Sequence, residues 1–264
     1  MEGATDAQAV TFEQRLAHRI ASASTHLCVG LDPRPDLIDG DVYDFLRHVV
    51  DDVAEEAAAF KPNIAYFEAM GAAGYQILEK ILIHIPKPVP IILDAKRSDI
   101  PETQTYYARA YFENWNVDAV TLNPYLGVDS CEPFFRYADK GVYVLAVTSN
   151  PGASDFQLKK NHDRYLFQDV VDKTATVRPD GATVGLVVGL TQASDEVFSR
   201  IPDVPLLIPG LGAQGGELGL LSLASRRAPI VVNVSRSLLY DSGAEGFRRR
   251  AKTFKEKIDD AFRG

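Results

Sequence analysis

The chain has 264 residues, of which 46% are hydrophobic and 24% are charged, and its formal net charge is −8. This length suits one α/β barrel, and the composition is ordinary for a soluble globular protein. The negative charge argues against a general nucleic-acid-binding or anionic-membrane surface, although it leaves room for a local anion site. We therefore expect one domain that spans residues 1–264 and binds no nucleic acid.

Cysteine usage and the N-terminal sequence indicate the cellular compartment. Only Cys28 and Cys131 occur, far apart and without the spacing of a metal site, which is typical of a reduced cytosolic protein. Residues 1–10 lack the basic and apolar regions of a secretory signal, and the apolar runs are too short to span a membrane. We expect a soluble, cytoplasmic protein.

Short apolar runs rich in β-branched residues recur along the chain and predict β-strands. They are continuous rather than alternating, as expected for parallel strands that are buried on both faces. In chain order they cover residues 27–32, 57–63, 89–96, 119–124, 142–149, 182–190, 205–212 and 230–237.

Segments with helical spacing separate these runs. An N-terminal helix is expected around residues 12–23, and further helices over 41–57, 66–82, 103–115 and 247–262. The interval 150–181 is expected to hold a loop before its helix. Eight strands alternating with helices predict a (β/α)8 TIM barrel with an extra N-terminal helix. A doubly wound open sheet remains the alternative, because spacing alone does not distinguish the two folds.

Polar residues fall at the ends of the predicted strands, where a barrel carries its chemistry. These residues are Asp32, Lys61, Asn63, Asp94, Lys96, Asn123, Ser149, Asn150, Ser235 and Arg236. Individually, Asp32 and Asn123 also fit turns, Lys61 fits an outward-directed lysine, and Arg236 fits a surface ion pair. Their joint occurrence at one end of a barrel favours a functional site.

The segment LDAKRSDIPET, residues 93–103, concentrates charge directly after a predicted strand. Asp94 and Lys96 are two residues apart on a strand, so their side chains leave on the same face. Asp99 lies in the turn that opens a helix, where it also fits an N-cap. Two carboxylates near one ammonium keep it protonated, which disfavours Schiff-base chemistry. The arrangement suits a fixed cation that stabilises developing negative charge and then donates a proton.

A second motif, PGLGAQGGELG, covers residues 209–219 and matches the pattern GxGxxG. A dinucleotide site is disfavoured, because the strand is the seventh of eight and no acidic residue follows at the required distance. The alternative is the phosphate site that barrels form after strands seven and eight. We assign to it the glycine amides around Gly212, Gly215 and Gly216, together with Gln214 and, from the eighth strand, Arg236. The expected ligand is a phosphorylated small molecule whose reacting part lies near Lys96.

With these motifs identified, the chain resembles orotidine 5′-phosphate decarboxylases, in particular the bacterial type-2 branch. The matching pieces are GLDPRPD, FKPN, LDAKRSDIPET, TLNPYLG, TSNPG, PGLGAQGG and NVSRS, in the family's order over roughly residues 27–240. Ser98 is a departure, because type-2 members commonly have glycine there. The resemblance implies decarboxylation of orotidine 5′-monophosphate to UMP and CO2, the last step of de novo pyrimidine biosynthesis, with no metal and no organic cofactor.

The resemblance also implies roles for individual residues. Lys61, Asp94, Lys96 and Asp99 match the family's charged network, in which Lys96 protonates C6 of the pyrimidine. Asp32 and Lys61 match ribose-binding residues, Ser149 a pyrimidine contact, and Gln214 and Arg236 phosphate contacts. We count Thr103, Asn123, Pro209, Gly212 and Gly215 as further substrate-binding residues. The family's usual assembly is a homodimer in which Asp99 and Thr103 reach the neighbouring subunit's site.

Two other functions remain to be weighed. Metal-dependent sugar-phosphate lyases share the DxKxxD signature, but they need an acidic metal ligand where this chain has Lys61. A non-catalytic nucleotide-binding barrel would keep the phosphate residues without needing the lysine–aspartate network, which is intact in this sequence.

Overall fold

Eight parallel strands form the centre of the molecule. The computed structural model describes residues 10–176, 182–210, 219, 226–241 and 246–263. The strand order is β2-β1-β10-β9-β8-β5-β4-β3. Parallel bridges Phe60–Ile91 and Asn63–Asp94 join β2 to β3, so the sheet closes into a barrel. The predicted (β/α)8 barrel is confirmed, and the doubly wound alternative is wrong.

Each of the eight predicted apolar runs coincides with one strand of the barrel, although β5 begins one residue before its run and β3 ends one residue beyond its run. The strands are β1 (Leu27–Leu31), β2 (Ala59–Pro62), β3 (Ile92–Arg97), β4 (Ala119–Leu122), β5 (Gly141–Val147), β8 (Thr183–Val188), β9 (Leu206–Ile208) and β10 (Ile230–Val234). Two further short strands, β6 (Lys160–Asn161) and β7 (Arg164–Tyr165), pair in an antiparallel hairpin within the interval 150–181.

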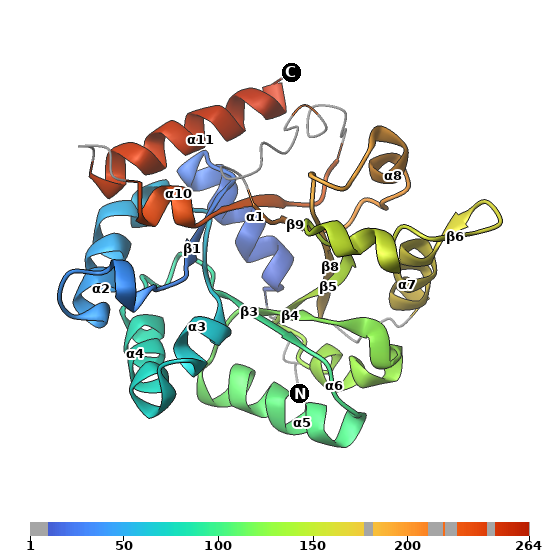
Figure 1. The fold of residues 1–264 in the computed structure, drawn as a ribbon, viewed down its shortest axis with the longest axis horizontal. Helices are drawn as coiled ribbons and strands as arrows, with labels where there is room; N and C mark the ends of the chain where they lie inside the picture. The colour runs from blue at the N-terminus through green and yellow to red at the C-terminus, as the bar shows by residue number, and fades with distance from the viewer. Residues whose placement is uncertain (1–9, 177–181, 211–218, 220–225, 242–245, 264) are drawn as a thin grey trace, which may run out of the picture.

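Helices surround the barrel, and one helix lies across its centre in projection (Figure 1). The α-helices are α1 (Phe12–Ala23), α2 (Val42–Val53), α3 (Ile64–Glu68), α4 (Gly71–His84), α5 (Pro101–Ala108), α6 (Glu132–Phe135), α7 (Leu166–Thr176), α8 (Asp195–Ser199), α10 (Arg236–Leu239) and α11 (Phe247–Arg263). A π-helix, η3 (Arg109–Asn114), continues α5. The 3-10 turns are η1 (Pro35–Leu37), η2 (Ala54–Glu56), η4 (Pro124–Leu126), η5 (Val128–Ser130) and η6 (Pro151–Asp155).

The predicted helix over residues 66–82 is two helices. The chain breaks between α3 and α4 at Gly71, whose φ of +63° lies in the left-handed region that favours glycine. Gly74 packs against α3 so closely that a Cβ there would lie 1.9 Å from the carbonyl oxygen of Phe67. The sequence GAAG therefore marks a break and a close helix contact rather than a continuous apolar stripe.

The apolar residues divide into two cores. The larger core lies between the strands and the outer helices, as the amphipathic helices α2 and α11 predict. The smaller core fills the barrel interior, where Phe12 and Leu16 of α1 pack against strand residues such as Ile92, Ala119 and Tyr143. Gly141 permits this packing, because a Cβ there would lie 2.3 Å from the Phe12 ring. The extra N-terminal helix thus closes the inside of the barrel.

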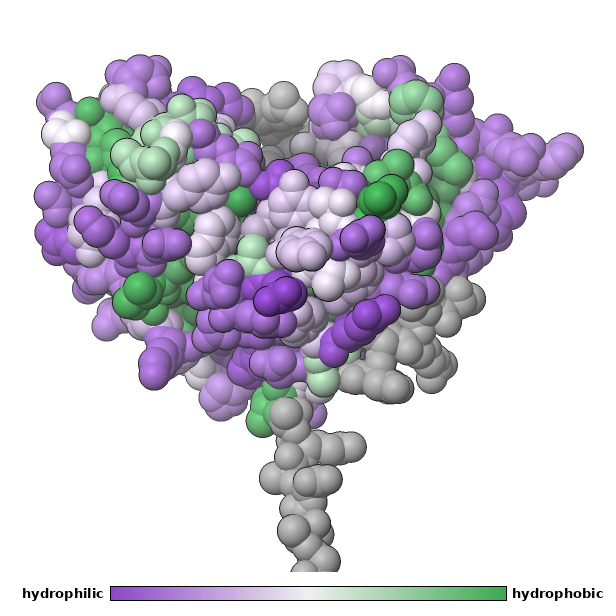
Figure 2. Space-filling view, turned by 90° about the horizontal axis from the view of Figure 1, so that it is seen from below, coloured by the Kyte–Doolittle hydropathy of each residue, from purple (hydrophilic) through white to green (hydrophobic). Residues whose placement is uncertain are grey.

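The outer surface is mostly hydrophilic on the side of α5 (Figure 2). Apolar side chains are nevertheless exposed in this region of the chain, including Ile100 at the start of α5 and Tyr106 within it. In the part of the chain that the structure describes, no helix has the length and apolarity needed to cross a membrane.

Candidate active site

Alternation along the strands positions the candidate site. Ile92 of β3 belongs to the interior core, and because side chains alternate, Asp94 also faces into the barrel. The ammonium of Lys96 lies beside the Asp94 carboxylate. The same rule places Lys61 inside on β2, two residues after the interior Ala59. The inward positions of these strands thus change from apolar to charged as each strand approaches its C-terminal end.

Asp94 lies at the centre of the charged group. Its Oδ1 is 2.6 Å from Nζ of Lys96, and its Oδ2 is 2.9 Å from Nζ of Lys61. Lys61 and Asp94 are almost fully buried, whereas 48% of the Lys96 side chain is exposed. Two ammonium groups therefore share one carboxylate, and only Lys96 extends into open space.

Burial and neighbouring charge have opposite effects on the pKa values of Asp94 and Lys61. Burial alone would raise the pKa of Asp94, but Lys61 and Lys96 hold that pKa well below its usual range. Burial alone would lower the pKa of Lys61, but the Asp94 carboxylate raises it above its usual range. The pair is thus charged on both sides at neutral pH.

The backbone of β3 is irregular at the site. The pairing with β4 shifts register between Leu93 and Arg97, and Lys96 has a φ of +46°, which is costly for a residue with a Cβ. Such irregularities re-aim side chains next to active sites. The N–H of Lys96 donates to Oγ1 of Thr121 at 2.9 Å, and Arg97 pairs with Glu68 and Tyr111.

Asp99 differs from the sequence-based expectation. The two acidic residues do not bracket Lys96 within one chain, because among the described residues only Asp94 forms an ion pair with it. Oδ1 of Asp99 instead accepts the N–H of Ile100 at 2.8 Å, and Ile100 is the N-cap of α5. Thr103 lies in the first turns of α5 and is half-buried.

Asp32 follows β1 and is hydrogen-bonded to the segment that follows β10, the last strand of the barrel. Its Oδ2 accepts a hydrogen bond from Oγ of Ser235 at 2.5 Å, and its carbonyl accepts one from Tyr240 at 3.0 Å. Gly30 permits this approach, because a Cβ there would lie 2.7 Å from Cβ of Ser235. Among the described residues, the buried Oδ1 of Asp32 has no hydrogen-bond partner, so it remains available as an acceptor.

Two further predicted residues follow β4 and β5. Oδ1 of Asn123 accepts the N–H of Tyr125 at 3.1 Å and caps a 3-10 turn, which is the turn role that the sequence also allowed. Ser149 packs closely on Gly189, where a Cβ would lie 2.6 Å from the Ser149 nitrogen. Because both residues follow the C-terminal ends of parallel strands, they lie at the same end of the barrel as Asp94.

The predicted phosphate site is described only in part. Pro209 directly follows β9, and Arg236 begins α10 with an exposed side chain. Gly212, Gln214, Gly215 and Gly216 lie outside the described residues, so their grouping with Arg236 stays a prediction.

Three residues near the site were not assigned a role from the sequence: Thr121, Asn233 and Ser235. Thr121 and Asn233 are buried, and Oδ1 of Asn233 has no partner among the described residues. The available signal was strand parity, because Thr121 and Asn233 are each two residues beyond an interior apolar residue.

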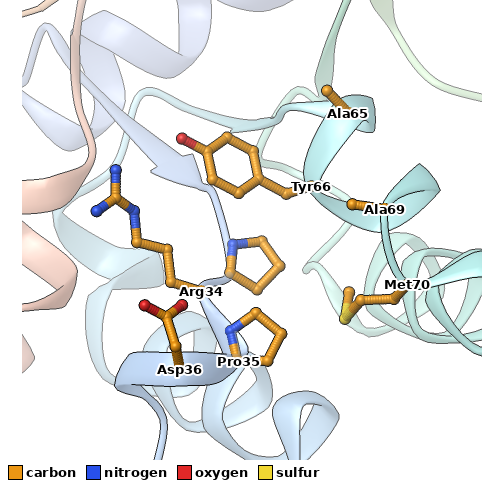
Figure 3. Close-up of a pocket in the computed structure, with 8 residues that line it drawn as sticks. Arg34, Pro35, Asp36, Ala65, Tyr66, Ala69 and Met70 are labelled. Atoms are coloured by element: carbon orange, nitrogen blue, oxygen red, sulfur yellow. The ribbon is translucent and has the colours of Figure 1, made fainter.

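A pocket of about 490 Å³ lies at the loop that follows β1 (Figure 3). The loop after β1 and helix α3 line it, through Pro33, Arg34, Pro35, Asp36, Ala65, Tyr66, Ala69 and Met70. Tyr66 extends from α3 toward the loop that carries Arg34 (Figure 3). None of the predicted site residues lines this pocket.

The model of the orotidine 5′-phosphate decarboxylase / HUMPS family matches residues 25–244. The chain belongs to this family. It is 41% identical to an orotidine 5′-phosphate decarboxylase of Roseiflexus sp. (strain RS-1), over 96% of this chain and 97% of the relative. It is 38% identical to the enzyme of that name from Herpetosiphon aurantiacus, over 95% and 96%.

A solved structure agrees with this assignment to the decarboxylase family. The structure of Leishmania donovani OMP decarboxylase superposes with a TM-score of 0.83 at 36% identity, covering 96% of this chain and 99% of that chain. In the described part of this chain, no cluster of three or more His, Cys, Asp and Glu side chains is placed to hold a metal ion.

Proposed function

We propose that the protein decarboxylates orotidine 5′-monophosphate to UMP and CO2. The observation that carries the proposal is the carboxylate of Asp94 shared by the buried Lys61 and the half-exposed Lys96. This arrangement fixes a charged ammonium at the open end of the barrel. Membership of the decarboxylase family supports the same reaction.

The proposed chemistry follows from the placement of Lys96. The bond between C6 and the carboxylate carbon breaks, CO2 leaves, and the electron pair remains on C6. The Lys96 ammonium stabilises this developing charge and then transfers one proton to C6, giving UMP. Because about half of the Lys96 side chain is exposed, it is accessible to substrate and afterwards regains a proton from water.

Residues at the ends of other strands bind the ribose, the pyrimidine and the phosphate of the substrate. Oδ1 of Asp32, which has no partner among the described residues, accepts a ribose hydroxyl, and Ser149 contacts the pyrimidine. Arg236, together with Pro209, Gly212, Gln214 and Gly215, binds the 5′-phosphate. Binding energy from the phosphate, remote from C6, helps to organise the charged network.

Lys61 separates this proposal from a metal-dependent lyase of the same family. Its ammonium lies 2.9 Å from Oδ2 of Asp94, where such a lyase needs a carboxylate that binds a cation. The test is the absorbance change when purified protein meets orotidine 5′-monophosphate in EDTA. Rapid conversion to UMP is expected. No conversion, or conversion only after metal is added, would contradict the proposal.

The proposed assembly is a cytoplasmic homodimer of one-domain chains, in which Asp99 and Thr103 serve the neighbouring subunit's site. It is supported by Asp99, which makes no ion pair with the Lys96 of its own chain, and by the exposed apolar side chains of Ile100 and Tyr106 near it. Mixing inactive Lys96→Ala and Asp99→Ala subunits tests the arrangement. Restored activity is expected, because one site of the mixed dimer then has both native side chains. A mixture that stays inactive would place Asp99 in its own chain's site.

A further inference from the structure

Thr121 of β4 occupies an inward position that the proposed mechanism does not yet use. It follows the interior Ala119 by two residues, and only 1% of its surface is exposed. A threonine in a strand is ordinary, because β-branched side chains suit a pleated sheet. Its hydrogen bonds, however, reach both ionised partners that the reaction depends on.

The hydroxyl of Thr121 bridges the backbone of Lys96 and the side chain of Asp94. Oγ1 accepts the N–H of Lys96 at 2.9 Å and donates to Oδ1 of Asp94 at 2.9 Å. A hydroxyl has one proton to donate, so accepting from the amide leaves that proton directed at the carboxylate. Oδ1 of Asp94 also accepts a hydrogen bond from Nζ of Lys96. Lys96, Thr121 and Asp94 are thus joined in a ring by three hydrogen bonds.

This bridge lies at the irregularity of β3. Between Leu93 and Arg97 the register with β4 shifts, and pairing resumes where the N–H of Asn123 donates to the carbonyl of Arg97 at 2.9 Å. Because the Lys96 N–H is displaced from the regular hydrogen bonding between β3 and β4, it donates to a side-chain hydroxyl and not to a backbone carbonyl. Thr121 therefore holds Lys96 in its positive-φ conformation, which is strained for a residue with a Cβ.

We propose that Thr121 is a positioning residue that fixes the Lys96 ammonium and the Asp94 carboxylate in their reactive geometry. This inference rests on the proposed function. Without the hydroxyl, the Lys96 amide loses its acceptor, the strained backbone relaxes, and Asp94 loses one of three donors. The ammonium then points away from C6 while the ribose and phosphate contacts stay intact. The loss appears in kcat and not in KM.

The test compares Thr121→Val, Thr121→Ser and the control Thr25→Val. Thr25 is also 1% exposed, and its hydroxyl also makes one donated and one accepted hydrogen bond: it donates to the backbone carbonyl of Glu56 at 3.0 Å, where Thr121 donates to a carboxylate, and it accepts the N–H of Leu27 at 3.1 Å. It precedes β1, at the opposite end of the barrel from Asp94. The two valine variants therefore lose the same number of buried hydrogen bonds, and Thr121→Val should lower the melting temperature more, because one of its lost bonds goes to a charged carboxylate.

With orotidine 5′-monophosphate as substrate, Thr121→Val should lower kcat by roughly 10- to 100-fold, since small misplacements of reacting groups cost about this much. Its KM should stay close to that of the wild type. Thr121→Ser restores the hydroxyl and should restore most of kcat, and Thr25→Val should keep the wild-type kcat. If Thr121→Val does not fold, Thr121→Ala has the same expected results.

Equal kcat values for the Thr121 and Thr25 variants, or a change in KM alone, would overturn the inference. Wild-type protein that fails to convert the substrate would instead overturn the proposed function. An NMR signal of the Lys96 side chain, assigned with Lys96→Ala, tests the positioning role without substrate. The signal should shift in Thr121→Val and not in Thr25→Val, and an unshifted signal would contradict the role.

Discussion

The two ends of the barrel interior are built from the same strands and differ in chemistry. At the N-terminal end, Phe12 of α1 packs among apolar strand residues such as Ile92. At the C-terminal end, the next inward position of β3 is Asp94, which binds two lysines. Ile92 and Asp94, which lie in the apolar and the charged environment, are only two residues apart, which is one period of side-chain alternation along a strand.

This difference shows how the fold separates stability from chemistry. The apolar end removes side chains from water and so contributes folding free energy. The charged end contains a buried carboxylate, an Asp32 oxygen that has no hydrogen-bond partner among the described residues, and a strained Lys96 backbone. A protein selected only for stability would lack these features. Changes at the apolar end should therefore affect unfolding, and changes at the charged end should affect the reaction.

The largest expected combined effect on stability and activity at the charged end comes from Asp94→Asn. It leaves the buried Lys61 ammonium without its counterion, which should cost about 3–5 kcal/mol of unfolding free energy. It also releases Lys96, so kcat/KM should fall by roughly 10³-fold or more. Urea unfolding and steady-state kinetics measure the two losses, and a variant of native activity would contradict the central role of Asp94.

The pH dependence of this stability difference provides a control. Because the pKa of Asp94 is depressed in the folded protein, its stabilisation is fully present above the unfolded pKa of about 3.9. The advantage of the wild type over Asp94→Asn should stay constant from neutral pH to about pH 5 and shrink as pH falls below about 4, when the unfolded state takes up the proton first. An advantage that is lost near pH 6 would indicate another group.

At the apolar end, Phe12→Ala should cost about 3–5 kcal/mol of unfolding free energy, because the side chain is fully buried and Gly141 leaves no side chain to fill the space. The kcat/KM of the folded variant should stay within about threefold of the wild type, since the N-terminal face of a barrel serves stability. Urea unfolding and kinetics on one preparation test this. A large loss of activity in the folded state would break the comparison.

Ser235→Ala should have a smaller effect at the charged end. It removes the hydrogen bond that holds Asp32, and hydrogen bonds to charged groups contribute roughly 1.5–3 kcal/mol. KM should rise about tenfold or more, with a smaller change in kcat. Ser130→Ala is the control, because it also removes one serine hydroxyl, but that hydroxyl donates to the carbonyl of Gly127. Equal KM values for the two variants would remove Ser235 from substrate binding.

The smallest expected effect is the absence of thiol reaction in the native protein. Cys28 lies in the interior core, close enough to Lys61 and Asp94 to feel their charges. Burial raises the pKa of Cys28 to about 12 and that of Cys131 to about 11. Neither thiol should react with Ellman's reagent at pH 8 until urea unfolds the chain. Rapid labelling of Cys28 would show that the barrel interior opens to solvent.

The features that the sequence predicted depend on local spacing. The strands were found because doubly buried strands read as continuous apolar runs, and the Asp94–Lys96 contact was found because residues two apart share a face. The N-terminal helix was also found at its observed bounds. In each case the physical cause lies within a few residues of the pattern.

The features that the sequence did not reveal depend on contacts between distant segments. Closure of the barrel requires β2 to bridge β3, which spacing does not encode. The roles of Thr121 and Ser235 follow from which strands are neighbours and from the register shift in β3. The break at Gly71 did have a local signal, the glycine itself, but the apolar stripe around it concealed the break.

The most direct test of the separation between the two ends is Lys96→Ala, measured for kcat/KM with orotidine 5′-monophosphate and for thermal unfolding on the same sample. Lys96 is half-exposed and Asp94 keeps Lys61 as a partner, so the melting temperature should change by only a few degrees. The loss of kcat/KM should be roughly 10⁴-fold or more, because charge stabilisation and proton donation disappear together. Retained activity, or a loss explained by unfolding, would contradict the account.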